Sequence, residues 1–157
     1  MIVLGDFNTS VSKALSEIDP KWRDYTGLVV CGTHSPTNPE ILIDEIRQAR
    51  ESGMPALLIC YGHQLGAIEY ARSRGIKDAT SEEWSENGTF IVKKRPEGLK
   101  VGLHEGESWW SNYFVDMEYI PNDNFVSVPY HPEYGSAIGI PHPDLVKFLN
   151  LCKKYEN

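Results

Sequence analysis

The sequence contains no long hydrophobic run and no excess of basic residues. No apolar stretch approaches the ~20 residues that a membrane-spanning helix needs, and the first residues, MIVLGDFN, lack the basic and apolar regions of a signal peptide. With 15 Lys and Arg against 22 Asp and Glu, the net charge is -7. Nucleic-acid and anionic-membrane surfaces need a cationic footprint, and the one basic run, 93–95, is predicted to be a solvated strand end. We therefore expect neither nucleic acid nor membrane among the partners.

Cysteine is also scarce, because the chain has only Cys31, Cys60 and Cys152. An odd number of cysteines without paired spacing does not suggest a disulfide framework, and free thiols favour the reducing cytoplasm. No internal repeat, low-complexity segment or linker interrupts the 157 residues, and that length is typical of one domain. We therefore predict a single cytoplasmic domain over residues 1–157.

The chain does contain a regular alternation of apolar runs and helix-like segments. Short apolar runs predict buried strands at residues 2–4, 28–31 and 56–59, and a segment with helical apolar spacing follows each of them. Strands that are apolar at every position are usually covered by helices on both faces, as in parallel sheets. The first half therefore predicts a doubly wound β-α-β-α-β-α arrangement.

The predicted helices have recognisable ends. Thr9 or Ser10 is the predicted cap of the first helix, Asn38 and Pro39 are predicted to open the second, and Gly53 is predicted to close it. The predicted inner faces are Val11, Ala14, Leu15 and Ile18, then Leu42, Ile46 and Ala49, then Leu65, Ile68 and Ala71.

The second half of the chain has a different pattern. Strands are predicted at residues 90–92, 99–103, 114–120 and 125–128. The segment PNDN at 121–124 is predicted to be a turn between the last two strands, and a helix from about Pro143 is predicted to follow. The whole sequence thus predicts an α/β domain with a doubly wound, mostly parallel sheet flanked by helices, and with a small antiparallel portion toward the C-terminus.

One thiol lies where a strand is predicted to become a helix, in the segment ICYGHQ. In an α/β sheet, functional groups collect beyond the carboxyl ends of the strands, and Cys60 is predicted at such an end. The following helix supplies unpaired N–H groups and a positive dipole end, which stabilise a thiolate and can hold an oxyanion. Gly62 allows a tight turn. A buried, hydrophobic cysteine is the alternative interpretation of this stretch.

A thiol nucleophile needs a base, and the best candidate is His131 in the segment VPYHPEY. It follows an apolar strand, and Pro132 stiffens the backbone after it. Glu133 can turn to the same side, where its carboxylate would fix the imidazole tautomer and stabilise the cation. His63 is closer to Cys60 in sequence but is expected to point along the helix. The alternative is that His131 and Glu133 form an exposed pair at the end of a strand, or that they bind a metal ion, although the sequence shows no second cluster of metal ligands.

Together the two segments resemble the triad-type, class I glutamine amidotransferases, and the resemblance covers nearly the whole chain. Within that family the sequence is most similar to the glutaminase domain of CTP synthase, through SVSKAL, YTGLVVCG, ICYGHQLGAIEYAR and KDATSEEW in the same order. The resemblance implies the flavodoxin-like fold of that family and no cofactor. It also implies that Cys60 attacks the side-chain amide of glutamine, with His131 as general acid and base and Glu133 orienting it. A γ-glutamyl thioester would form, ammonia would leave, and water would release glutamate.

Other positions carry over from the family one at a time. Gly32, in the loop CGTHSP, matches one oxyanion donor, and the backbone of Tyr61 would provide the other. Gln64 matches the glutamine that lines the substrate pocket. Glu83 matches the acid that holds the substrate ammonium in CTP synthases, with Glu82 one residue away as the alternative. An exposed acidic turn is the other interpretation of these two acids.

The sequence also departs from the family pattern. Thr33 and His34 stand where small or glycine residues are preferred. The segment LHEGESWWSN, at 103–112, contains no arginine where CTP synthases hold the substrate carboxylate. Trp109, or its neighbour Trp110, is a candidate wall of the pocket. The chain is shorter than family members, and no part of it resembles a synthetase.

These observations predict a glutaminase that acts on glutamine or a γ-glutamyl compound and passes ammonia to a separate synthetase. Two other classes stay open, namely a non-catalytic binding module of the same fold and a small cysteine-elbow protein that acts on peptides or aldehydes. The intact Cys60, His131 and Glu133 favour an enzyme over a binding module. The order of nucleophile before His-Pro-Glu speaks against the third class. A hydrolase of γ-glutamyl conjugates is the alternative enzyme.

Overall fold

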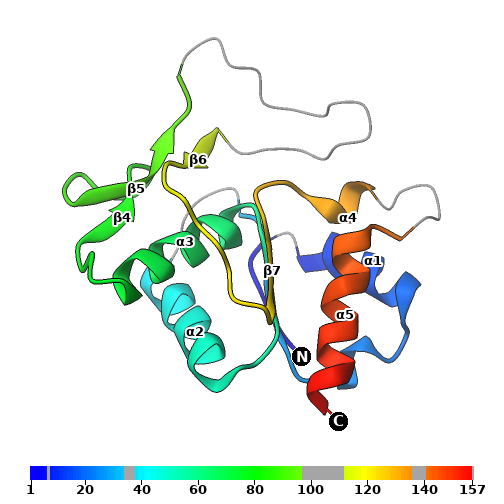
Figure 1. Ribbon diagram of the computed structural model, residues 1–157. Coiled ribbons are helices and arrows are strands. Elements are labelled where there is room, and N and C mark those ends of the chain that lie inside the picture. The colour runs from blue at the N-terminus through cyan, green and yellow to red at the C-terminus, as the bar shows by residue number, and fades with distance from the viewer. Residues whose placement is uncertain (7, 34–37, 97–111, 136–140, 157) are drawn as a thin grey trace.

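The computed structural model describes residues 1–6, 8–33, 38–96, 112–135 and 141–156. Its central sheet has four strands in the order β1-β2-β3-β7, all of them parallel (Figure 1). The bounds are β1 Ile2–Leu4, β2 Leu28–Val30, β3 Ala56–Ile59 and β7 Phe125–Val128. In this register Val30 lies beside Leu58, and Ile59 lies beside Val128. The predicted doubly wound, mostly parallel sheet is confirmed.

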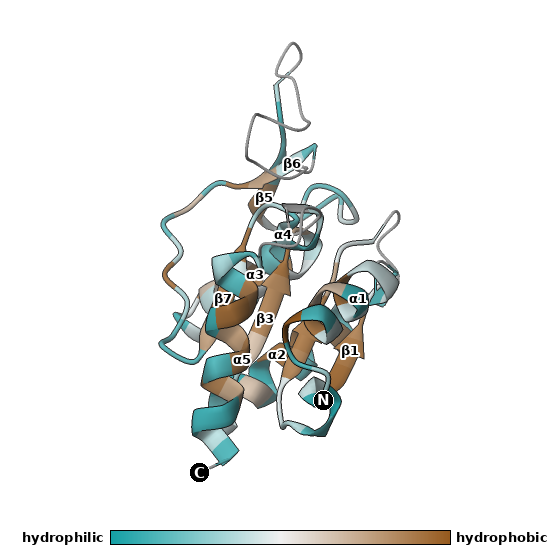
Figure 2. Cartoon of the chain, turned by 90° about the vertical axis from the view of Figure 1, so that its right-hand side faces the viewer, coloured by the Kyte–Doolittle hydropathy of each residue, from teal (hydrophilic) through white to brown (hydrophobic). Residues whose placement is uncertain are grey.

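Helices cover both faces of this sheet. On one face α2 (Pro39–Ser52) and α3 (Tyr61–Ser73) pack against Val30 and Leu58. On the other face α1 (Asn8–Ile18) and α5 (Pro143–Glu156) pack against Val29 and Leu57. Because successive residues of a strand point to opposite faces, β2 and β3 are buried on both sides. Figure 2 shows these apolar strands between helices whose outer faces are hydrophilic.

The start of α1 requires a correction. The helix begins at Asn8, so Thr9 and Ser10 lie inside it and the predicted cap is wrong. The side-chain amide of Asn8 donates a hydrogen bond to the carbonyl of Gly5 (2.9 Å). The chain therefore turns into the helix earlier than the apolar spacing indicates.

The ends of α2 are confirmed, whereas its inner face is slightly different. Asn38 precedes Pro39, and Gly53 ends the helix in the left-handed region with φ 76°. The buried residues of α2 are Ile43, Ile46 and Ala49. Leu42 is only partly buried: it packs against the core and also lines a cavity beside Tyr61.

The remaining helices follow the sequence closely. α3 buries Leu65, Ile68 and Ala71 as predicted, and α5 begins at Pro143 as predicted. Two short elements are additional to the prediction: a 3-10 helix, η1 (Trp22–Asp24), and a four-residue helix, α4 (Pro132–Gly135). The turn at η1 buries Trp22, whose indole donates a hydrogen bond to the hydroxyl of Ser16 (2.8 Å).

A second, smaller sheet lies beside α3 and has three strands in the order β4-β5-β6 (Figure 1). The bounds are β4 Ala79–Ser81, β5 Thr89–Lys94 and β6 Tyr113–Val115. β4 pairs with β5 in parallel, and β5 pairs with β6 antiparallel. The small sheet is therefore mixed, and it precedes β7 in the chain. The sequence pattern does not predict β4.

The predicted strand at 114–120 is shorter than expected and ends at Val115. Beyond it, Met117 and Tyr119 pack against the core as irregular chain. The predicted turn at 121–124 is present, since the N–H of Phe125 bonds the carbonyl of Asn122 (3.0 Å). It leads from the small sheet to the central sheet instead of closing a hairpin. The predicted strand at 99–103 lies outside the described residues.

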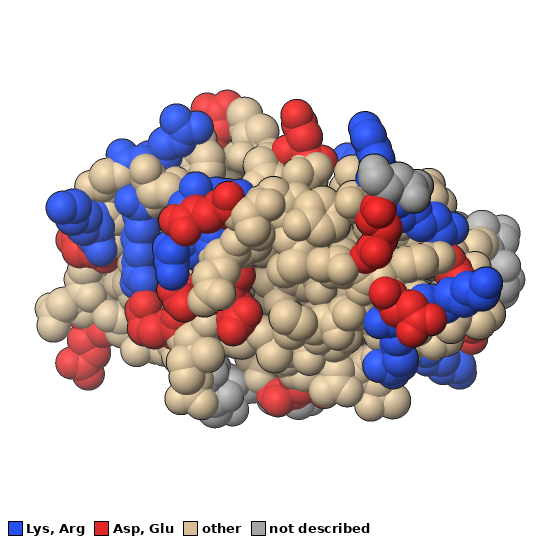
Figure 3. Space-filling model, turned by 90° about the horizontal axis from the view of Figure 1, so that it is seen from below, with Lys and Arg blue, Asp and Glu red and all other residues tan. Residues whose placement is uncertain are grey.

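The basic run lies at the end of β5, where Lys93 and Lys94 are exposed. Lys93 forms an ion pair with Asp116 (Nζ–Oδ2 2.7 Å), so the run is a solvated strand end, as predicted. Seen from below, basic and acidic side chains are interspersed around an uncharged area (Figure 3). Within the described part of the chain, no helix is both long enough and apolar enough to cross a bilayer.

An ion pair joins the two helices that cover one face of the sheet. The side chain of Glu69 on α3 is 6% exposed, and that of Arg50 on α2 is 33% exposed, with Nη2 and Oε1 2.8 Å apart. A second bond joins the Arg50 Nε to the same carboxylate (2.9 Å). A buried carboxylate is costly unless a cation and hydrogen bonds compensate it. The pair therefore holds α2 against the helix that follows Cys60.

Arg50→Ala should lower the free energy of unfolding by about 3 kcal/mol, the low end for breaking a buried pair, because Arg50 keeps some contact with solvent. Urea denaturation measures this change. The matched control is Arg47→Ala, since Arg47 pairs with the exposed Asp44 and Glu51, and its effect should stay within about 0.5 kcal/mol. The double variant Arg50→Met/Glu69→Leu should regain most of the loss. Equal losses for Arg47→Ala and Arg50→Ala would contradict this account.

Candidate active site

The chain turns sharply between β3 and α3, and Cys60 occupies that turn. Its backbone has φ 54° and ψ -99°, and a positive φ is uncommon for a residue other than glycine. The N–H of Cys60 donates to the carbonyl of Val128 on β7 (2.8 Å), so the residue is still attached to the sheet. Backbone conformations of this kind persist only where the surroundings over-determine them, and they cluster at active sites.

Gly62 permits this turn because the start of α3 presses against β2. A Cβ at position 62 would lie 2.3 Å from the carbonyl oxygen of Val30. Any side chain there would push the first turn of α3 off the sheet. The requirement for glycine therefore comes from a close approach to backbone and not from a positive φ.

The amino end of α3 offers backbone donors beside the thiol. α3 begins at Tyr61, directly after Cys60, and no side chain caps it. The first N–H groups of a helix have no acceptors within the helix, and the positive end of the helix dipole lies there. Both features stabilise negative charge on a thiolate or on an oxyanion.

His131 and Glu133 come from the chain that follows β7, the strand next to β3. The His131 Nδ1 and the Glu133 Oε1 are 2.6 Å apart, and both residues are buried. α4 begins between them, at Pro132, and its turn places the two side chains on the same side. With Nδ1 bonded to Glu133, Nε2 is the ring nitrogen that can face the thiol.

A hydrogen bond joins the side chains of His131 and Cys60. Burial lowers the pKa of His131, but the bonds with Cys60 and Glu133 outweigh burial and raise that pKa to about 9. The imidazole is therefore protonated near neutral pH, where it can pair with a thiolate and donate a proton. The structure brings these three predicted residues together from two segments, the turn between β3 and α3 and the chain that follows β7.

Gly32 follows β2 at the same edge of the sheet and is buried. Its carbonyl accepts a hydrogen bond from the N–H of Asp6 (3.1 Å), and the hydroxyl of Thr33 donates to the Asp6 carboxylate. These bonds join the loop after β2 to the loop after β1. Gly32 thus lies at the end of the strand beside the one that carries Cys60. His34 lies outside the described residues.

Gln64 and Glu83 lie on the side of the site that faces the small sheet. Gln64 is buried in the first turn of α3, and its amide nitrogen is 3.5 Å from the carbonyl oxygen of Tyr113 on β6. Glu83 follows β4, and burial raises its pKa. Burial raises the pKa of Tyr61 and of Tyr113, and the charge of Glu83 raises both further. The charge of Glu82 also raises the pKa of Tyr113, whereas of the two acids only Glu83 acts on Tyr61.

The structure separates the two acids that the sequence leaves open. Glu82 is exposed, and its carboxylate accepts the backbone N–H of Lys94 (3.0 Å). Glu83 is the acid that lies near Tyr61, the residue directly after Cys60. Trp109 and its neighbour Trp110 lie outside the described residues, as does nearly all of the segment 103–112.

The surroundings of His63 differ from the sequence prediction. Its ring reaches β7 instead of pointing along the helix, with Nδ1 2.7 Å from the hydroxyl of Ser127. Burial lowers the pKa of His63 to about 4, so the ring is neutral near pH 7. Tyr119 lies beside it, with ring centroids 5.2 Å apart. The lone polar residue in the apolar strand FVSV was the available signal for this contact.

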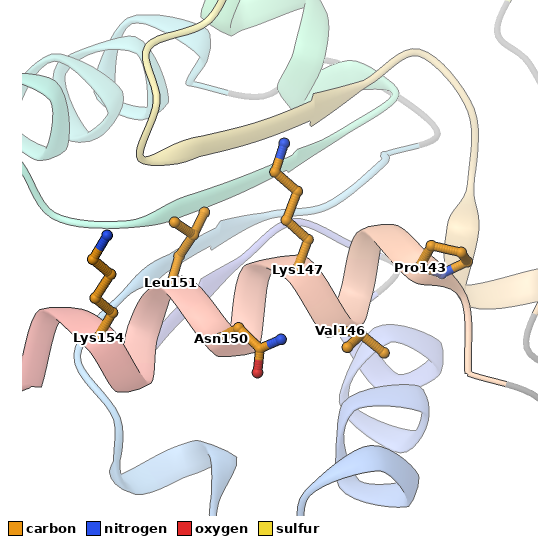
Figure 4. Close-up of a pocket in the computed structure, with 6 residues that line it drawn as sticks. All are labelled: Pro143, Val146, Lys147, Asn150, Leu151 and Lys154. Atoms are coloured by element: carbon orange, nitrogen blue, oxygen red, sulfur yellow. The ribbon is translucent and has the colours of Figure 1, made fainter.

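Two cavities differ in their chemistry. One of about 270 Å³ lies at the carboxyl ends of β1 and β2 and is lined by Asp6, Thr33 and Tyr61, among others. The other, of about 470 Å³, opens on α5, and the 6 residues drawn around it all come from that helix (Figure 4). It has lysines, an asparagine and apolar side chains but no thiol, imidazole or carboxylate.

Among the residues described, no cluster of three or more His, Cys, Asp or Glu could hold a metal ion.

Comparisons with known proteins identify the family of the chain. A family model described as glutamine amidotransferase class-I matches residues 6–106. The chain is 43% identical over 96 residues to a CTP synthase of Methanoregula boonei, covering 60% of this chain and 18% of that protein. It is 36% identical over 189 residues to a CTP synthase of Coprothermobacter proteolyticus, covering 85% of this chain and 35% of that protein. The chain therefore spans about a third or less of these relatives.

A solved structure has the same fold. The glutaminase domain of CTPS from Trypanosoma brucei, solved with bound acivicin, aligns with a TM-score of 0.73 and 14% sequence identity. The alignment covers 98% of this chain and 94% of that domain. At this level of identity the likeness establishes the fold.

The two histidines near the thiol should titrate at opposite ends of the pH range. In nitrogen-edited NMR spectra, the His131 ring should stay doubly protonated up to about pH 9, and the His63 ring should be neutral above about pH 4. Cys60→Ala removes one of the bonds that raise the pKa of His131, so that pKa should fall while the pKa of His63 stays constant. An unchanged His131 pKa in this variant would contradict the contact.

The raised pKa of His131 also predicts how the stability of the fold changes with pH. Because the folded-state value of about 9 lies above the ordinary one, protonation of His131 stabilises the fold fully below about pH 6.5. That contribution is lost as the pH rises through about 9. The difference in unfolding free energy between the wild type and His131→Ala should shrink over the same interval.

Proposed function

Because the chain belongs to the class-I glutamine amidotransferase family, we propose that it is a glutaminase. It hydrolyses the side-chain amide of glutamine through a cysteine thioester and yields glutamate and ammonia. One observation carries the proposal: a thiol on a sharp strand-to-helix turn is hydrogen-bonded to a buried imidazole, which a carboxylate holds at 2.6 Å. The reaction as written needs no cofactor.

Cys60 is the nucleophile in the first half of the reaction. Its thiolate attacks the amide carbon, and negative charge develops on the amide oxygen. His131 is protonated near neutral pH, because its pKa is about 9, and it donates that proton to the departing nitrogen. The C–N bond breaks, ammonia leaves, and a γ-glutamyl thioester remains on Cys60.

Water completes the second half. Neutral His131 accepts a proton from the water molecule as its oxygen attacks the thioester carbon, and the C–S bond then breaks. Glutamate leaves, and the thiolate and imidazolium are restored. Glu133 keeps Nδ1 protonated and the ring oriented through both halves, so that the other ring nitrogen makes each transfer.

The surrounding groups fit the charges of such a substrate. The backbone N–H groups of Gly32 and Tyr61 are the proposed oxyanion donors, since they lie at the end of β2 and the start of α3, on either side of the Cys60 turn. Gln64 lines the pocket, and Glu83 receives the α-ammonium group, because a charge-assisted bond suits a half-buried carboxylate. Trp109 is a proposed wall of the pocket, because of its place in the segment 103–112.

We assign the ammonia to a separate synthetase in the cytoplasm. In the T. brucei protein the glutaminase is one domain of CTPS, which supports the pairing of this chain with a synthetase. The cysteines Cys31, Cys60 and Cys152 are free and buried, which suits a reducing compartment.

The purified chain should release glutamate from glutamine, and Cys60→Ser should abolish this release. Cys31→Ser and Cys152→Ser should retain it. Burial raises the pKa of both thiols to about 12, with a further contribution from the charge of Glu133 at Cys31, so neither thiol ionises near pH 7. A glutamine analogue with an electrophilic side chain should add its mass to Cys60 alone, as measured by peptide mass spectrometry.

Label on Cys31, or turnover by Cys60→Ser, would sink the assignment of the nucleophile. γ-Glutamyl amides belong in the same assay. Their hydrolysis without hydrolysis of glutamine would identify a γ-glutamyl hydrolase. Binding of glutamine without hydrolysis of either compound would identify a binding module.

His131→Ala should lower kcat by about 10²- to 10⁴-fold, the usual contribution of a positioned acid or base. Glu133→Gln should lose less than His131→Ala, because Glu133 orients the ring without transferring the proton. His63→Ala should also lose much less, since the thiol bonds His131. Steady-state kinetics on folded protein measure all three variants. A larger loss at His63 than at His131 would overturn the pairing.

A further inference from the structure

The first turn of α3 contacts the two strands that flank β3 in the sheet. On the β2 side, Gly62 lies so close to the carbonyl of Val30 that a Cβ would be 2.3 Å away. On the β7 side, the Nδ1 of His63 lies 2.7 Å from the hydroxyl oxygen of Ser127. β3, which leads into Cys60, lies between β2 and β7 in the sheet. Consecutive residues of one helical turn therefore contact both strands that flank the strand of the thiol.

The contact with β7 belongs to a small polar cluster. Phe125 packs in the core under α2 and α3, so Ser127, two residues along the strand, lies on the same face. The hydroxyl of Ser127 is also hydrogen-bonded to that of Tyr119, and a serine hydroxyl can both donate and accept. The Tyr119 hydroxyl in turn lies 2.7 Å from where a Cβ on Gly66 would be. The cluster thus fills the space between α3 and β7.

His63 is unsuited to proton transfer at the thiol. Its pKa is about 4 because it is buried, so it carries no charge at neutral pH. The thiol of Cys60 is hydrogen-bonded to His131 instead. A neutral imidazole retains one donor and one acceptor, so its bond to Ser127 is maintained across the neutral pH range.

We propose that His63 is a positioning residue whose hydrogen bond to Ser127 clamps the first turn of α3 onto β7 and so holds Cys60 opposite His131. Cys60 leads into α3, and His131 follows β7, so a bond between these two elements controls the separation of the reacting groups. The unusual backbone of Cys60 needs such support from its surroundings. The kinetic consequence rests on the proposed glutaminase function, whereas the clamp itself is tested through the reactivity of the thiol.

The experiment uses the full chain and follows alkylation of Cys60 by iodoacetamide at pH 7, with the Cys60 peptide quantified by mass spectrometry. His63→Ala should lower the alkylation rate constant and the kcat for glutamine by about 10-fold, because a small misplacement of reacting groups is costly, while KM changes little. His63→Asn places an amide nitrogen near the position of Nδ1 and should regain most of both rates. His63→Gln places it near the position of Nε2 and should not.

Ser127→Ala removes the other end of the same bond and should show the same loss. The double variant His63→Ala/Ser127→Ala should lose no more than either single variant, because both changes remove one interaction. The matched control is Ile46→Val, which trims a fully buried side chain in the same core cluster. It should lower the thermal midpoint without changing either rate in the folded protein.

Three results would overturn the clamp: unchanged alkylation in folded His63→Ala, additive losses in the double variant, or equal rescue by Asn and Gln. Alkylation does not require turnover. A wild-type chain without glutaminase activity would therefore disprove the proposed function, while the alkylation series would still decide the role of His63.

Discussion

The backbone of Cys60 is the constraint on which the rest of the site depends. A residue with φ 54° between a strand and a helix stays there only if both neighbouring elements are fixed. The sheet fixes one side, through the bond from the Cys60 N–H to Val128. The close contact of Gly62 with Val30 fixes the other. Because β7 lies directly beside β3, the bond that holds Cys60 also fixes the end of β7, from which the chain continues to His131. The order of the strands therefore places His131 beside Cys60.

The partners of a buried side chain then give identical residue types opposite pKa shifts. His63 and His131 both lie within the folded interior, yet the pKa of one falls to about 4 and that of the other rises to about 9. The difference is the partner: a neutral hydroxyl for His63, and a thiol and a carboxylate for His131. The surroundings of the cysteines also differ. Cys31 is buried, which raises its pKa to about 12, whereas the imidazole of His131 lies beside Cys60. Selectivity among chemically equal side chains thus follows from which charged group each one meets.

Local periodicity predicts the parts of the fold that local chemistry determines. β3 has the predicted bounds and α5 begins at the predicted residue, because an apolar run and a Pro-led helical pattern are properties of short segments. β4 and the end of β6 at Val115 depend on pairing with β5, and neither segment contains that information in its own pattern. The site divides in the same manner. Cys60 follows from a strand-to-helix pattern. The polar Ser127 in an apolar strand signals only that it has a polar partner, and no local rule identifies that partner as His63 across the sheet.

Under the proposed function, the small sheet explains why Glu83, and not Glu82, would receive the substrate ammonium. Burial destabilises the charged form of a carboxylate, and it raises the pKa of Glu83. Within the described residues no lysine or arginine forms an ion pair with it, and the nearby phenols of Tyr61 and Tyr113 are neutral at pH 7. An arriving α-ammonium group would supply the missing cation and restore the charged form. Glu82 has no such need, because solvent and the backbone N–H of Lys94 already stabilise it. Under the proposed function, Glu83 is therefore the acid that would receive the cation, at the position where β4 ends.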